Sequence, residues 1–139
     1  MSQPVQQPEQ TYFVDRSLGR VTFPSILRDA GWKLVTLAEH YGVPTDQDIA
    51  DTQWIADAAQ RGWPILMKDK RIRYRPAEIG AVAEHGAKCF VATRGDLASH
   101  AYAERFIANQ KTIAKAAGMA GPYIYAVHAD RIERMYPPS

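Results

Sequence analysis

Residues 62–75 read GWPILMKDKRIRYR, and this stretch decides the expected fold. The apolar run from Ile65 to Met67 passes directly into a charged segment that contains Asp69. A short apolar run bounded by turn residues on one side and charges on the other is typical of a buried strand. The stretch therefore predicts a central strand that ends at an aspartate beside a basic rim.

Asp69 is expected at the carboxyl end of that strand. Open α/β sheets bind their ligands in the crevice outside the carboxyl ends of the strands. A hard divalent cation such as Mg2+ or Mn2+ needs several oxygen ligands. Asp69 therefore indicates a site for such a cation only if further carboxylates reach the same edge of the sheet.

Length and composition indicate one ordinary globular domain. The chain has 139 residues, of which 46% are hydrophobic and 23% charged, enough for a single core. Residues 1–10 are rich in Gln and Pro and are expected to form a disordered tail, so the domain is expected to cover residues 11–136. A formal charge of +2 is too small to indicate nucleic-acid binding by itself.

Several classes of protein are disfavoured by the sequence. Cys89 is the single cysteine, so it has no partner for a disulfide or a thiolate metal site. No apolar stretch approaches the ~20 residues that span a bilayer. The N-terminus lacks the basic and apolar regions of a secretion signal. We therefore expect a cytoplasmic protein that does not bind membranes.

Expected strands and helices alternate along the chain, which favours an α/β fold: a mostly parallel sheet with helices on both faces. Residues 37–45 are less regular, and residues 130–135 are expected to form a small hairpin or extension. Thr22 is expected to cap the first helix. Strands are expected at residues 11–14, 32–36, 65–67, 88–93 and 123–127, and helices at 22–30, 46–61, 76–85 and 97–117.

Asp15 and Asp51 are candidates to join Asp69. Asp15 follows the first strand as Asp69 follows the third, which places both on one edge of a parallel sheet. Asp51 lies near the start of a helix that is expected to run antiparallel to the strand before Asp69, so the helix start lies beside the strand end.

Other acids compete with Asp51. Asp46 and Asp48 lie close to the same helix start, where acids are favoured whatever the function. Glu39, after the second strand, is a candidate for a fourth acid.

Basic residues surround Asp69, and they are expected to contact phosphates of a ligand at the mouth of the site. A solvated loop is the alternative interpretation of such a charged run. The residues concerned are Lys68, Lys70, Arg71, Arg73 and Arg75, joined by Arg16 after the first strand.

Three motifs resemble the PIN-like domain family, especially its compact VapC45-like group. They are FVDRSL at residues 13–18, DTQWI at 51–55 and GWPILMKDKRI at 62–72. The resemblance covers about residues 11–135. The family's spacing to the glycine at Gly62 is met only if Asp51, and not Asp46 or Asp48, is the middle aspartate.

The resemblance implies a metal-dependent endoribonuclease, a hydrolase that is often the toxin of a toxin–antitoxin pair. It implies that Asp15, Asp51 and Asp69 are catalytic and bind Mg2+ or Mn2+. The family's further Glu has no clear counterpart, and Glu39 is the nearest residue to that role. RNA and an antitoxin protein are the implied partners. Separately, the long amphipathic helices expected at residues 46–61 and 97–117 are of a kind that can support a homodimer.

The implied chemistry suits these residues. Clustered carboxylates disfavour one another's ionised forms, and a divalent cation relieves that repulsion. The cation can lower the pKa of a bound water and orient a phosphodiester, so no side-chain nucleophile is required.

Two alternatives remain. A phospho-acceptor receiver domain also has acids after its first and third strands, but it usually has paired acids after the first strand and a lysine after the last. This chain has Asp15-Arg16 and His128 there. The second alternative is a catalytically inactive PIN-fold module that binds nucleic acid or protein, which a test of metal-dependent cleavage distinguishes.

Overall fold

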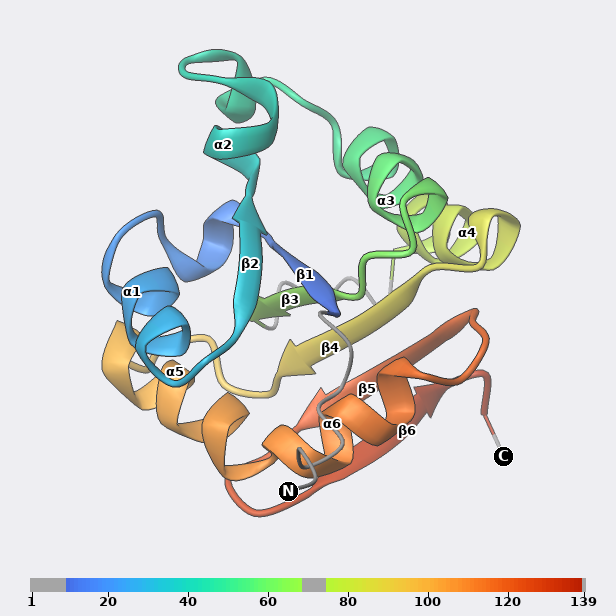
Figure 1. Ribbon diagram of the computed structural model, residues 1–139. Coiled ribbons are helices and arrows are strands. Elements are labelled where there is room, and N and C mark those ends of the chain that lie inside the picture. The colour runs from blue at the N-terminus through green and yellow to red at the C-terminus, as the bar shows by residue number, and fades with distance from the viewer. Residues whose placement is uncertain (1–9, 69–74, 139) are drawn as a thin grey trace, which may run out of the picture.

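The structure, a computed structural model, describes residues 10–68 and 75–138. These residues form a six-stranded sheet in the order β2-β1-β3-β4-β5-β6, shown in Figure 1. Neighbouring strands from β2 to β5 pair in parallel, and β6 is antiparallel to β5. The predicted α/β class is confirmed. The strands are β1 Thr11–Val14, β2 Lys33–Thr36, β3 Ile65–Lys68, β4 Lys88–Ala92, β5 Tyr123–Val127 and β6 Ile132–Tyr136.

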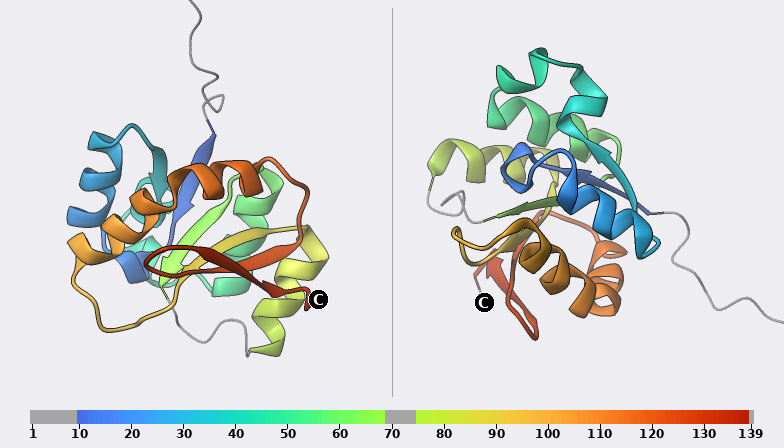
Figure 2. Two further views of the ribbon diagram at one scale, coloured as in Figure 1. Left: turned by 90° about the horizontal axis from the view of Figure 1, so that it is seen from below. Right: turned by 90° about the vertical axis from the view of Figure 1, so that its left-hand side faces the viewer.

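Helices cover both faces of the sheet, as the right-hand view of Figure 2 shows. Alternate strand residues point to opposite faces, so Val14 and Leu66 belong to one core, whereas Phe13 and Ile65 belong to the other. The first core is covered by α1 Thr22–Asp29, α5 Ser99–Ala108 and α6 Gln110–Ala117. The second is covered by α2 Leu37–Tyr41, α3 Asp51–Gln60 and α4 Pro76–His85.

The helix expected at residues 46–61 begins later than predicted. The 3-10 helix η2, Thr45–Gln47, comes first, and the Asp46 N–H donates to the Gly42 carbonyl at 2.8 Å. Ala50 is extended, with φ −66° and ψ 147°, so α3 starts at Asp51. The break makes Asp51 the first residue of its helix.

The segment expected to be irregular contains the short helix α2. Its start carries a capping box, in which Thr36 and Glu39 each bind the other's backbone N–H through their side chains. Such reciprocal bonds satisfy N–H groups that a helix start leaves unpaired. Thr22 does not cap α1 as predicted, because Val21 occupies the cap position and Thr22 already lies inside the helix.

The helix expected at residues 97–117 is divided at Asn109. The Asn109 Nδ2 donates to the carbonyl oxygens of Arg105, at 2.8 Å, and His128, at 2.9 Å. The second bond joins the α5–α6 junction to the end of β5.

None of the helices in the described part of the chain has the length and hydrophobicity that a membrane span requires.

The position of β1 determines where a site can form. The sheet continues from β1 to β2 on one side and to β3 on the other, and Val14 of β1 pairs with Leu66 of β3. Such a change of direction in the strand order is where open α/β sheets bind ligands. The 3-10 helix η1, Arg16–Leu18, follows directly after β1 and Asp15.

Candidate functional site

Asp15 lies at the carboxyl end of β1 and is completely buried. Its backbone N–H donates to the Leu66 carbonyl of β3 at 3.0 Å. Ser17 Oγ donates to Asp15 Oδ2 at 2.6 Å and accepts a longer bond from the Lys68 N–H at 3.4 Å. Ser17 therefore connects the Asp15 carboxylate to Lys68, the last residue of β3.

Asp51 lies at the first position of α3, and its side chain is 13% exposed. The indole Nε1 of Trp54, one helical turn later, donates to Asp51 Oδ1 at 3.0 Å. Trp54 is fully buried, and its ring lies 6.1 Å from that of Phe13 in β1. A rigid, packed donor thus fixes the orientation of the Asp51 carboxylate.

Two arginines lie close to this carboxylate. Arg16 Nη2 is 3.8 Å from Asp51 Oδ1, and Arg75 Nη1 is 3.8 Å from Asp51 Oδ2. Because Arg16 directly follows Asp15 in the chain, this contact joins the end of β1 to the start of α3. The residue that follows Asp15 therefore lies beside Asp51.

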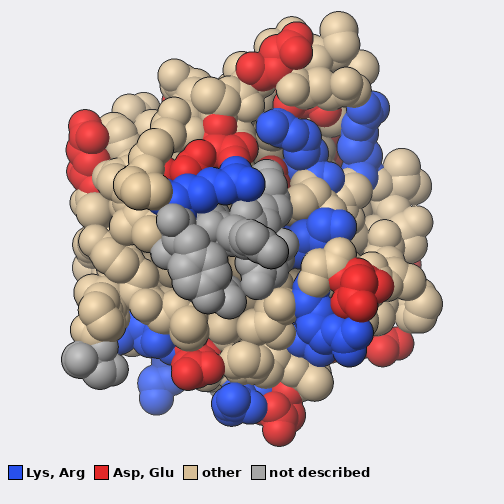
Figure 3. Space-filling model, turned by 180° about the vertical axis from the view of Figure 1, so that it is seen from behind, with Lys and Arg blue, Asp and Glu red and all other residues tan. Residues whose placement is uncertain are grey.

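Acidic and basic side chains also meet at the surface. On the side hidden in Figure 1, a basic side chain lies across a group of acidic ones, with further basic side chains to the right in this view (Figure 3). An exposed ion pair contributes about 0–1 kcal/mol to stability. Pairs of this kind can therefore exchange partners with an incoming cation or phosphate at small cost.

Asp69, the third predicted acid, lies outside the described residues, as do Lys70, Arg71 and Arg73. In the part of the chain that is described, no three His, Cys, Asp or Glu residues are grouped to hold a metal ion. The chain order nevertheless places Asp69 directly after Lys68, the residue that Ser17 connects to Asp15.

Glu39, the predicted fourth acid, is engaged by α1 and by the start of α2. Its carboxylate accepts bonds from Arg28 at 2.7 and 3.0 Å and from the Thr36 N–H at 2.9 Å. Partial burial raises the pKa of Glu39, but the bonds from Arg28 and Thr36 and the Arg28 charge outweigh it, so the pKa is lowered. Both carboxylate oxygens are therefore used in holding α2 to α1.

The described basic residues lie on both sides of the acids. Lys68 Nζ is 5.7 Å from the ring centroid of Tyr102, within reach of a cation–π contact. The Arg16 and Arg75 side chains are 34% and 51% exposed. These two remain accessible to a phosphate group while they contact Asp51.

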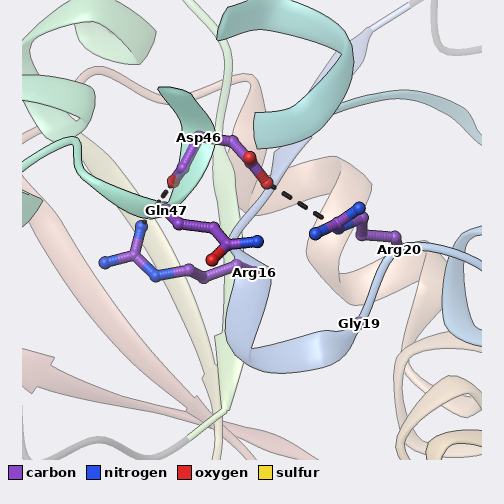
Figure 4. Close-up of a pocket in the computed structure, with 5 residues that line it drawn as sticks. All are labelled: Arg16, Gly19, Arg20, Asp46 and Gln47. Carbon is purple, nitrogen blue, oxygen red and sulfur yellow. Dashed lines mark hydrogen bonds and ion pairs between the residues drawn. The ribbon is translucent and has the colours of Figure 1, made fainter. Parts of the chain in front are cut away.

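A pocket adjoins this group of acids, formed by residues of η1 and η2 and the turn after η1 (Figure 4). Asp46 is buried; its carbonyl accepts from Arg16 Nη1 at 3.0 Å, and its Oδ2 lies 3.7 Å from Arg20 Nε. The lining residues are Arg16, Gly19, Arg20, Asp46 and Gln47.

Sequence reasoning missed the roles of three side chains. Trp54 was not recognised as a partner of Asp51, although its position three residues after Asp51 puts both on one face of a helix. Ser17 and Arg20 gave no signal, because their contacts depend on how η1 folds against β3 and η2.

The donor set suits a hard divalent cation. Asp15 and Asp51 provide carboxylate oxygens, the ligands that Mg2+ and Mn2+ prefer. Each carboxylate is oriented by a hydrogen bond from a side chain that is not itself a ligand, Ser17 or Trp54. Such outer partners commonly orient metal ligands.

Comparison with known proteins identifies a family and a relative of this chain. The family described as "PIN like domain" matches residues 11–94. A Mycobacterium tuberculosis protein named "Putative ribonuclease VapC45" is 45% identical over 123 residues, which cover 88% of this chain and 89% of that protein. No solved structure matches the chain.

Proposed function

Because the chain belongs to the PIN-like domain family, we propose that it is a metal-dependent endoribonuclease that hydrolyses RNA phosphodiester bonds. The proposed ligands of Mg2+ or Mn2+ are Asp15, Asp51 and Asp69, with Glu39 as a candidate fourth acid. The observation that carries the proposal is the contact of Arg16 with Asp51. Because Arg16 follows Asp15, this contact brings the start of α3 to the end of β1, where β1 pairs with β3.

Asp15, Asp51 and Asp69 would hold the cation, which would supply water activation and electrostatic stabilisation of the phosphate. The residues of the chain hold and orient the reacting groups. Ser17 and Trp54 fix the carboxylates of Asp15 and Asp51. Arg16 and Arg75 have accessible guanidinium groups with N–H donors for phosphate oxygens.

The proposed substrate is RNA, bound through its phosphates. Contacts are assigned to Arg16, Lys68 and Arg75 among the described residues and to Lys70, Arg71 and Arg73 beyond them. We further propose that the protein is a toxin restrained by an antitoxin chain, as the resemblance to the VapC45-like group implies. A homodimer is a further proposal.

The test is cleavage of a labelled single-stranded RNA by purified protein with Mg2+, Mn2+ or EDTA. Asp15→Asn and Asp51→Asn each remove one charged ligand and keep the side-chain shape. We expect a loss of about a hundredfold or more in cleavage rate, since the metal contributes several kcal/mol to the reaction and each 1.36 kcal/mol is tenfold.

Asp130→Asn is the matched control, because Asp130 is exposed and pairs only with its neighbour Arg131 within the described residues. It is expected to cut at the wild-type rate. Binding of RNA without any metal-dependent cutting by folded wild-type protein would instead favour the inactive binding module. Cutting that persists in EDTA and in both site variants would exclude this carboxylate chemistry.

A further inference from the structure

The pocket beside the acids has the chemistry of an anion site. We propose that it binds a phosphate of the RNA strand adjacent to the phosphate that is cut, with Arg20 as the main contact. This inference rests on the proposed function, because it assigns a subsite of the same RNA. Its test nevertheless uses binding and not cleavage.

The first support is the balance of charge in the pocket. Arg16 and Arg20 contribute two guanidinium groups, whereas Asp46 is the one acid among the lining residues. The Arg20 side chain is 46% exposed and the Asp46 side chain is 1% exposed. Positive charge therefore predominates on the accessible side of the pocket, and the compensating carboxylate lies beneath it.

The second support is the state of the donors on Arg20. Its Nε lies 3.7 Å from Asp46 Oδ2, which is an ion-pair distance but too long for a hydrogen bond. Among the described residues the Arg20 guanidinium makes this ion pair and no hydrogen bond. A guanidinium has five N–H donors in a planar fork that matches phosphate oxygens.

The carboxylate of Asp46 positions the pocket without being open to a ligand. Its Oδ1 is buried and has no hydrogen-bond partner within the described part of the chain. Asp46 therefore serves to hold Arg20 through its side chain and Arg16 through its carbonyl oxygen.

Arg16 connects the pocket to the proposed cleavage site. Its Nη1 donates to the Asp46 carbonyl, and its Nη2 is 3.8 Å from Asp51. In Figure 4, the Arg16 and Arg20 side chains lie on opposite sides of Asp46. Arg16 therefore belongs both to this pocket and to the surroundings of Asp51, so a strand bound at the acids is proposed to continue past Arg16 to Arg20.

The experiment measures the affinity of full-length protein for fluorescent 12-nucleotide poly(A), poly(U) and poly(C) RNA in EDTA, over a series of salt concentrations. Arg20→Gln is expected to weaken binding to all three by the same factor, about tenfold, as charge-assisted bonds are lost. The slope of log affinity against log salt should fall in magnitude by about 0.7, the value for one phosphate contact on a single strand.

Arg61→Gln is the matched control. Arg61 is exposed at the C-terminal end of α3, the end opposite Asp51, and donates to the Asp57 carbonyl. The Arg61→Gln substitution removes the same charge from the protein and should leave both the RNA affinity and the salt slope near the wild-type values. If both variants weakened RNA binding equally, Arg20 would act only through the overall charge of the protein. That result would overturn the proposal.

A second variant guards against misfolding, because Arg20→Gln leaves the buried Asp46 carboxylate without its cation. The double variant Arg20→Gln/Asp46→Asn removes both charges and should bind RNA as weakly as Arg20→Gln. Recovery of wild-type affinity in the double variant, or a loss confined to one homopolymer, would overturn a phosphate subsite. Loss of metal-dependent cleavage without these binding changes would concern the nuclease proposal alone.

Discussion

Ser17 is the residue that connects the Asp15 carboxylate to the end of β3. Ser17→Ala removes the hydroxyl and is expected to lower the RNA cleavage rate about 10- to 100-fold, as is typical when an outer partner of a metal ligand is lost. Because the hydroxyl acts through Asp15, the Mn2+ concentration for half-maximal rate should rise. Metal titrations of cleavage measure both effects.

Ser25→Ala is the control for this prediction, since Ser25 is exposed on α1. Both variants should keep the wild-type unfolding temperature within a few degrees. A Ser17→Ala protein with the wild-type metal dependence would show that the hydroxyl has no influence on metal binding.

At the scale of residues, the sequence could place Asp15 at the end of a strand, because the apolar run stops there, but it could place Asp51 only near a helix start. The resemblance to a known family selected Asp51 over Asp46 and Asp48. The sequence could not predict that Asp46 is buried between two arginines, or that Glu39 binds Arg28. Those partners come from segments whose approach is decided by tertiary packing, which leaves no local pattern.

Among the connections between elements, the loop from α6 to β5 is tightly packed at Gly121. A Cβ added there would lie 2.3 Å from the Gly86 carbonyl oxygen and 2.9 Å from that of Ala87. Both contacts are with backbone atoms that pack beside the start of β4. Gly121→Ala is therefore expected to lower the free energy of unfolding by about 1–3 kcal/mol or more, the usual cost of overpacking.

Gly80→Ala makes the same substitution where there is room. Gly80 lies inside α4, and a Cβ there would meet nothing within 4 Å. This variant should raise the free energy of unfolding by about 0.5–1 kcal/mol, because alanine is the better helix former. Urea unfolding of both variants measures the two changes, and the same sign for both would contradict the packing argument.

At the scale of elements, the existence of the main strands and helices followed from apolar runs and breakers. Their bounds did not, because the breaks at Ala50 and Asn109 depend on contacts. Asn109 ends α5 while binding the distant carbonyl of His128. The capping box of α2 was visible as a Thr36–Glu39 pair, but a five-residue helix has too little periodicity to be recognised.

For the whole molecule, Cys89 reports on global unfolding. It is fully buried in β4, and burial raises the pKa of its thiol to about 12. At pH 8 only about one thiol in ten thousand would be ionised, against roughly a quarter in the unfolded chain. A thiol reagent should therefore modify folded protein at least about a thousandfold more slowly than denatured protein.

The raised pKa of the Cys89 thiol gives its contribution to stability a definite dependence on pH. The unfolded thiol titrates near pH 8.5, so above that pH the unfolded state loses this proton first. The contribution of Cys89 to stability therefore declines as pH rises from about 8.5 towards 12. In the thiol-labelling experiment above, rapid modification of Cys89 in folded protein at pH 8 would contradict the prediction and show that β4 opens locally.

The alternation of strands and helices was enough to predict the layered architecture, and the edge shared by Asp15 and the end of β3 followed from parallel pairing. The family resemblance is confirmed over the region that contains both. The order of the strands could not be deduced from alternation alone, because several crossover patterns satisfy it. The reversal of strand order beside β1 became visible only in the folded chain.

The pairing of Asp51 with Arg16 and Arg75 has a thermodynamic consequence for the proposed enzyme. A cation that binds Asp51 competes with both guanidinium groups, and phosphates that bind those groups draw them away from the carboxylate. Metal and RNA then favour each other's binding, and reciprocity requires each to strengthen the other by the same factor. If the proposed function holds, the protein is expected to bind its metal more weakly without RNA than with RNA in place.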